Sequence, residues 1–235
     1  MSHPHDILIL AVTRMRGGIC VAGMSGAADP ISRLQWVRPI KQRGPLLLGD
    51  IRYASGTLMR AGDVINWRMG APQPDPPHVE DVLVNPIRDR ANLLRQLDSP
   101  RRAKFCAGHL DRTPADVLRY ETRSLCLLQP DRVRASWRRD SYSGRYETRI
   151  AFQWRDFATD DRGYPVTDLA WRALGRAWLQ SREQLALDDA ALRERIGAIY
   201  LVVGRGRQFA GHHWPLIVGV HAPGLPKMEI DEESL

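Results

Sequence analysis

Apolar and polar side chains alternate with a period of two along residues 145–155. This alternation is typical of a β-strand with one buried face, whereas a helix would scatter the same apolar side chains around its surface. The face that we expect to be buried carries Tyr146, Thr148, Ile150, Phe152 and Trp154. The longest apolar runs, at 6–12 and 198–203, also have the length of strands and are far shorter than the ~20 residues of a membrane-spanning helix. The sequence therefore predicts a soluble, mainly β protein.

The first 88 residues consist of short strand patterns separated by turns. Apolar or alternating runs lie at 6–12, 19–24, 34–39, 63–69 and 78–84. Gly17-Gly18 marks a bend between the first two runs, and four prolines between Pro72 and Pro77 interrupt the pattern. This part of the chain is predicted to be an all-β unit.

Helical patterns replace the strands between residues 89 and 124. Residues 92–97 have a short helical spacing, and Thr113-Pro114 resembles a helix start with Thr113 as the N-cap. Strand patterns return from residue 125. They lie at 125–128, 132–138, 145–155, 198–203 and 214–220, and helical patterns at 167–181 and 188–196 separate the first three from the last two. Three strands, a helix and two strands is the element order of an OB-type five-stranded barrel.

The charge of the chain favours a polyanionic partner. The net charge is +7, and of 34 basic residues only Lys41, Lys104 and Lys227 are lysine. Arginine binds phosphate through two donors at once and stacks on aromatic rings. Residues 132–155 concentrate seven arginines against Asp140 and Glu147, so this stretch is predicted to form a basic strip.

Several short motifs, in order, resemble those of one known family. They are Thr13-Arg14-Met15-Arg16-Gly17-Gly18, Trp36-Val37-Arg38-Pro39, Gly62-Asp63-Val64-Ile65, Pro165-Val166-Thr167-Asp168, the stretch 201–209 and the stretch 214–221. From about residue 6 to residue 222 the chain resembles the dual OB-containing domain proteins of bacteria and archaea. The resemblance implies two OB-like barrels and a nucleic-acid-binding role, often beside prokaryotic immunity genes. It implies no catalytic residue.

We therefore expect a mainly β fold with helical insertions, in which a helical connector joins two OB-like five-stranded barrels. The expected divisions are an N-terminal barrel at 1–88, the connector at 89–124, a C-terminal barrel at 125–222 and an acidic tail at 223–235. Residues 1–6 show neither a secretory signal nor a lipidation motif, so we expect the protein in the cytoplasm and not at a membrane.

A groove for a single strand needs arginines for the phosphates and aromatic rings for the bases. The candidate nucleic-acid-binding residues are Arg14, Arg16, Trp36, Arg38, Trp137, Arg138, Arg139, Tyr142, Arg145, Arg149, Arg205 and Arg207. Ordinary core packing is the alternative for the tryptophans. Tyr142 is the best candidate for stacking, because it lies in the predicted turn at 141–144.

Catalysis and metal binding have weaker signals. Asp160, Asp161 and Asp168 are candidates for a metal-dependent nuclease, although a polar turn and a helix cap explain them more simply. Adjacent His212 and His213 point to opposite faces of a strand, and the cysteines at 20, 106 and 126 lie too far apart for paired zinc ligands. We expect no metal and no cofactor.

The predicted function is non-catalytic binding of nucleic acid, with single-stranded RNA or DNA favoured, in a prokaryotic defence or regulatory system. A protein-interaction module is the alternative from another class, because OB barrels also bind proteins and the acidic tail offers a surface for a protein partner. The sequence leaves open the choice between RNA and DNA.

Overall fold

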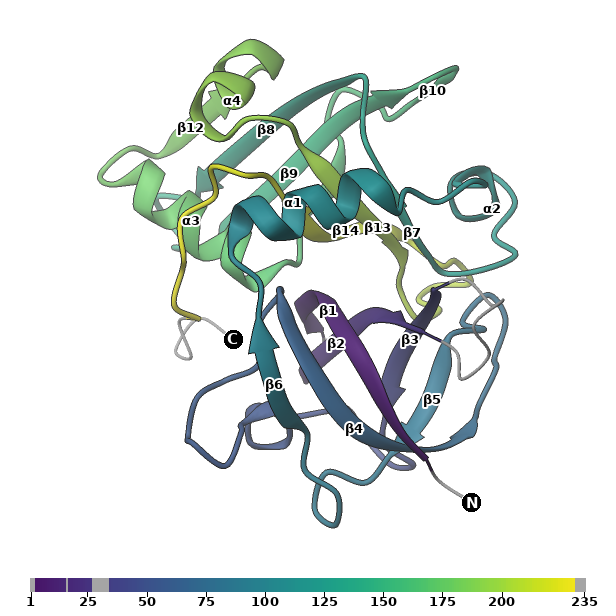
Figure 1. The fold of residues 1–235 in the computed structure, drawn as a ribbon. Coiled ribbons are helices and arrows are strands. Elements are labelled where there is room, and N and C mark those ends of the chain that lie inside the picture. The colour runs from purple at the N-terminus through teal and green to yellow at the C-terminus, as the bar shows by residue number, and fades with distance from the viewer. Residues whose placement is uncertain (1–2, 16, 27–33, 231–235) are drawn as a thin grey trace.

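The first part of the chain closes into a five-stranded barrel in the computed structural model, which describes residues 3–15, 17–26 and 34–230 (Figure 1). Around the barrel the strands follow the order β1-β2-β3-β5-β4-β1, with β3 and β5 parallel and the other pairs antiparallel. A single 3₁₀ turn, Leu48–Ile51, lies between β3 and β4. The strands are β1 (His3–Met15), β2 (Gly18–Ser25), β3 (Gln35–Ile40), β4 (Asp63–Pro72) and β5 (Asp81–Val84).

The second part repeats the same order of strands. Its first strand is bent and consists of β7 (Leu125–Leu128) and β8 (Arg132–Arg139). The β7 part pairs with β13, the fourth strand of this barrel, and the β8 part pairs with β9, the second strand. The third strand β11 pairs with β9, and next to it Val166 forms a parallel bridge to Ile217 of the fifth strand β14. The remaining bounds are β9 (Tyr146–Trp154), β11 (Tyr164–Pro165), β13 (Tyr200–Arg205) and β14 (Pro215–His221). The family's expected pair of OB-like barrels is therefore present.

Helices and short strands are added around this second barrel. Helix α3 (Leu169–Leu179) lies between the third and fourth strands, as the helical pattern over 167–181 predicts. The strand β12 (Gln184–Leu187) pairs with β8, and α4 (Asp189–Ile196) follows it. The two-residue strand β10 (Phe157–Ala158) pairs with β9.

The connection between the barrels corrects one expectation. Residues 92–97 do not form a helix: strand β6 (Asn92–Gln96) pairs with β4, and all five of its side chains are exposed. Backbone pairing with the open edge of β4 holds this segment, so the spacing of its leucines carries no information about its structure. Helices α1 (Ser99–Gly108) and α2 (Ala115–Leu118) follow, and Pro114 occupies the N-cap of α2 where Thr113 was expected.

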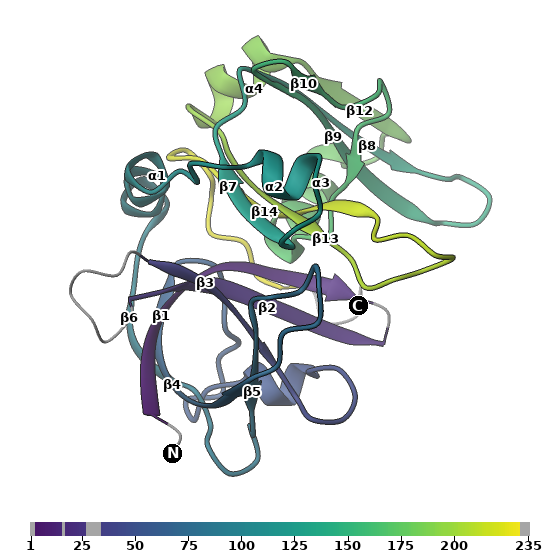
Figure 2. The same ribbon diagram turned by 90° about the vertical axis from the view of Figure 1, so that its right-hand side faces the viewer.

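The core has three parts. One cluster fills each barrel, and a third lies between them, where α1 and the outer faces of β1, β7 and β13 meet (Figure 2). Strand β1 serves two clusters, because alternate side chains point to opposite faces. Ile7 and Ile9 point into the first barrel, and Leu8 and Leu10 pack in the cluster with Leu127. The barrels therefore share an apolar interface.

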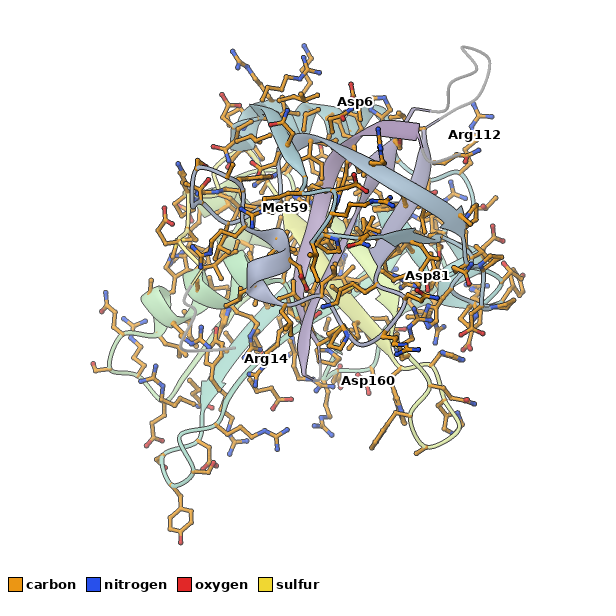
Figure 3. All side chains as sticks on the ribbon, turned by 90° about the horizontal axis from the view of Figure 1, so that it is seen from below. Asp6, Arg14, Met59, Asp81, Arg112 and Asp160 are labelled. Carbon is orange, nitrogen blue, oxygen red and sulfur yellow. The ribbon has the colours of Figure 1, made fainter. Side chains whose placement is uncertain are left out.

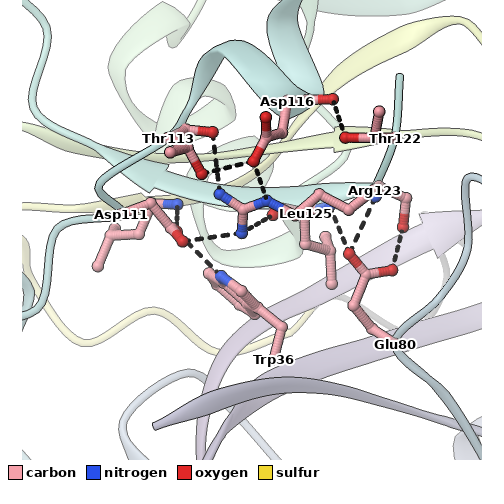
Figure 4. A network of polar contacts seen from close by, with 10 residues as sticks. Trp36, Glu80, Asp111, Thr113, Asp116, Thr122, Arg123 and Leu125 are labelled. Atoms are coloured by element: carbon pink, nitrogen blue, oxygen red, sulfur yellow. Dashed lines mark hydrogen bonds and ion pairs between the residues drawn. The ribbon is translucent and has the colours of Figure 1, made fainter. Parts of the chain in front are cut away.

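Hydrogen bonds to the carboxylates of Glu80 and Asp111 stabilise this interface (Figure 4). The carboxylate of Glu80, in the first barrel, accepts hydrogen bonds from the backbone nitrogens of Ser124 and Leu125 at 2.9 and 3.0 Å and from the Ser124 hydroxyl at 2.8 Å. The carboxylate of Asp111 accepts from the Trp36 indole at 3.0 Å and from the backbone of Leu127 at 2.6 Å. Both carboxylates thus join the first barrel to the start of β7.

We expect Glu80→Ala to lower the free energy of unfolding by about 3 kcal/mol or more, since it leaves buried donors of Ser124 and Leu125 without an acceptor. Chemical denaturation measures this loss. Glu80→Gln is the control, because its amide oxygen accepts the two backbone bonds and its amino group donates to the Ser124 hydroxyl. A loss of equal size in both variants would contradict this explanation.

Candidate nucleic-acid interface

Five arginines from both barrels line one surface hollow of about 730 Å³, which we call the arginine pocket. Arg14 comes from the end of β1 (Figure 3), Arg139 and Arg145 flank the turn between β8 and β9, and Arg172 and Arg176 lie one turn apart on α3. Gly144 and Tyr146 complete the lining. The first three arginines are among the candidates predicted from the sequence, and the two on α3 are not, although a spacing of four residues indicates a basic face on a helix.

Tyr146 lies beneath the arginines of α3. The guanidinium carbons of Arg172 and Arg176 lie 5.0 and 4.7 Å from the centre of its ring, and its hydroxyl donates to the Arg172 carbonyl at 2.9 Å. Burial raises the pKa of Tyr146 to about 12, so the phenol stays protonated at neutral pH. Burial, together with the charge of Arg176, lowers the pKa of Arg172. The tyrosine therefore supports the guanidinium groups through cation–π contact and adds no negative charge.

Packing against the second barrel fixes the orientation of α3. Asp168 caps the helix by accepting from the backbone nitrogen of Trp171 at 3.0 Å. On the inner face, Gly175 is so close to Trp137 that an added Cβ would lie 2.0 Å from the indole. Trp137 is itself 1% exposed. The helix thus presents its arginines to the pocket while its glycine contacts the core.

The predicted basic strip is divided between the two faces of the β8–β9 hairpin. Adjacent residues of a strand point to opposite sides, so Arg138 lies away from Arg139. Arg138 lines a second hollow of about 580 Å³, in which two carboxylates accompany the basic side chains. Its charged residues are Arg134, Arg138, Arg149, Arg162, Arg182, Glu147 and Asp161. Arg149 is paired there with Glu147 at 2.8 Å.

The tip of the hairpin carries an unburied aromatic ring. Tyr142 is fully exposed, as its predicted place in a turn requires. The turn is stabilised by Asp140, whose carboxylate accepts from the backbone nitrogen of Ser143 at 2.7 Å, and by Gly144, whose φ of 66° favours glycine. These contacts hold the Tyr142 ring in solvent at the tip of the hairpin whose Gly144 and Arg145 line the arginine pocket.

Several other predicted residues hold the fold together. Trp137 lies in the core, and Trp36 is half-buried in the Asp111 network. Arg205 is 9% exposed and donates to the carbonyls of Val117 and Leu118 at 2.9 and 3.0 Å. These residues are not part of the candidate interface, because a ligand can reach them only if the core packing or these hydrogen bonds are disrupted. Arg16 lies outside the described residues.

Arg38 and Arg207 share one buried carboxylate between the barrels. The Arg38 Nε donates to Asp81 at 2.6 Å, and Arg207 of the second barrel pairs with the same carboxylate. Arg207 also lies 3.5 Å from Asp75. Both arginines therefore take part in an ion-pair cluster that joins the barrels.

The carboxylates considered for a nuclease have structural contacts. Asp160 accepts from the backbone of Gly163 at 2.8 Å, and Asp168 is buried, caps α3 and accepts from Val220 at 2.8 Å. In the described part of the chain, neither these carboxylates nor other histidine, cysteine, aspartate or glutamate side chains form a group of three or more suited to a metal ion. None of the helices described there has the length and apolar character needed to cross a membrane.

This architecture is that of a two-barrel β protein with an arginine-lined surface hollow. A model of the dual OB-containing domain family matches residues 5–220, and the chain belongs to this family. No curated protein and no solved structure matches the chain. OB folds commonly bind nucleic acids or proteins through the strands and loops at one side of the barrel.

Proposed function

We propose that the protein binds single-stranded RNA or DNA without acting on it chemically, and that the arginine pocket holds the phosphates. The observation that carries this proposal is the convergence of five arginines from three separate parts of the chain on one surface hollow. Guanidinium groups match phosphate in shape and charge, and several of them side by side can bind successive phosphates of one strand.

The position of the pocket supports a nucleic acid as the source of these phosphates. The β8–β9 turn joins the first and second strands of its barrel, and this loop is one of those through which OB folds bind oligonucleotides. Tyr142 at its tip offers a ring on which an unpaired base can stack. The same proposal places the protein in the cytoplasm of a prokaryote, in a defence or regulatory system.

The test is a fluorescence-anisotropy titration with labelled single- and double-stranded RNA and DNA at several salt concentrations. We expect saturable binding that prefers single strands. The logarithm of the association constant should fall linearly with the logarithm of the salt concentration, with a slope near −0.7 for each phosphate contact. Binding that disappears at physiological salt would contradict the proposal and favour a protein partner, whose apolar contacts depend much less on salt.

A further inference from the structure

A large cleft of about 1350 Å³ opens between the two barrels, beyond their shared apolar cluster. The first barrel contributes the ends of β1 and β2 and the segment 38–48, and the second contributes β14 and the residues 204–209. Most of the wall is apolar, with Met15, Ile19 and Leu216 among its side chains. Clefts of this kind at domain interfaces are typical binding sites for small or planar groups.

Among the described residues that line the cleft, Arg38 has a buried donor without a hydrogen-bond partner. The Arg38 side chain is 7% exposed, and its Nε donates to Asp81. Its Nη2 is buried and forms no hydrogen bond within the described residues. An unsatisfied buried donor is costly, so a small shift of the Arg38 side chain towards an acceptor in the cleft gains a bond that the protein alone lacks.

An exposed ring lies at the rim. Phe209 lines the cleft and is 63% exposed, unlike the aromatic side chains of the core. Its backbone pairs with that of His212 in both directions, at 2.9 and 3.1 Å, so the position of the turn is fixed. The ring is thus held where a planar group in the cleft can stack on it.

Arg14 connects this cleft to the arginine pocket, because its side chain lines both. A strand whose phosphates lie on the arginine pocket therefore passes directly to the mouth of the cleft. An acyl chain would fit the apolar wall, but it brings no acceptor into the cleft for Arg38. A nucleobase brings both a flat face that stacks on apolar groups and carbonyl or ring-nitrogen acceptors.

We propose that the cleft holds an unstacked nucleobase of the bound strand, with its face against Phe209 and the apolar wall and a carbonyl or ring-nitrogen acceptor on the Nη2 of Arg38. This site rests on the proposed function, since the arginine pocket delivers the strand to it. It also predicts a preference for single strands, because a paired base cannot leave its stack without an energetic cost.

The test compares two single-stranded DNA probes of about 12 residues, one of thymidines and one with the same phosphodiester backbone but no bases. We expect Phe209→Ala to weaken binding of the thymidine strand by about 5- to 100-fold, the range for one stacked base, and to leave the abasic strand within about twofold of the wild type. Tyr120→Ala is the matched control. Tyr120 is a 66% exposed ring that lines neither the cleft nor the arginine pocket, so both strands should keep their wild-type affinities.

The outcomes separate the two proposals. An equal loss on both strands, no loss in Phe209→Ala, or the same loss in Tyr120→Ala would overturn the base site while leaving phosphate binding at the arginine pocket intact. If the wild type binds neither strand, the proposed function fails and the base site with it. Circular dichroism of each variant verifies that the fold is retained.

Discussion

Reversing the charges of Arg139 and Arg145 together is expected to weaken binding of a single-stranded oligonucleotide by about 100-fold or more. Each arginine supplies a charge-assisted contact worth about 1.5 to 3 kcal/mol, and the introduced glutamates repel the phosphates. Both side chains are exposed and form no ion pair with the described carboxylates, so their replacement should leave the fold intact. Anisotropy titrations at fixed salt measure the loss of affinity. The slope of the logarithm of the association constant against the logarithm of the salt concentration should become shallower by about 1.4, because two phosphate contacts are lost.

The opposite face of the same hairpin provides the control. Arg138→Glu with Arg182→Glu changes the net charge of the chain by the same amount, but both residues line the other hollow. We expect a loss of less than about tenfold, arising from the weaker long-range attraction alone. Equal losses in the two double variants would mean that total charge, and not the arginine pocket, determines binding.

Gly175→Ala is expected to lower the free energy of unfolding by about 2 kcal/mol, although alanine is normally the better helix former by about 1 kcal/mol. The reason is steric: the new methyl group would lie 2.1 Å from the Trp137 indole nitrogen and 2.3 Å from the Tyr146 hydroxyl. Either α3 or these rings must move, and Tyr146 supports the arginines of the pocket. Urea denaturation measures the stability, and weaker oligonucleotide binding should accompany its loss.

Gly108 of helix α1 is the matched position, because a Cβ there meets no atom within 4 Å. Gly108→Ala should therefore leave stability unchanged or raise it by up to about 1 kcal/mol. If Gly175→Ala were as stable as Gly108→Ala, the contact between α3 and Trp137 could not be what fixes the pocket.

Much of the fold is predictable because its strands have buried faces. The alternation over 145–155 matches β9, and the expected helix at 167–181 matches α3. Segments without a buried face were not predictable in this way. Strand β6 is exposed throughout, and the third strand of the second barrel, β11, has only two residues. The division of the chain at residues 88, 124 and 222 stays a prediction.

The candidate interface was harder to predict than the fold. The sequence places Arg138, Arg139 and Arg145 in one basic strip, yet only the last two line the arginine pocket. Charge counts along the chain do not record the face to which a side chain points. Arg205 shows a second limit, since a guanidinium that binds buried carbonyls has the same appearance in a sequence as one that faces a ligand.

The two-sided burial of β1 has a consequence for how the protein can be divided. Leu8 and Leu10 point out of the first barrel and are buried in the cluster that α1 and the second barrel complete. Either half expressed alone would expose its side of this cluster to solvent and tend to aggregate. The two barrels are therefore expected to fold and stay in solution only as a covalently joined pair.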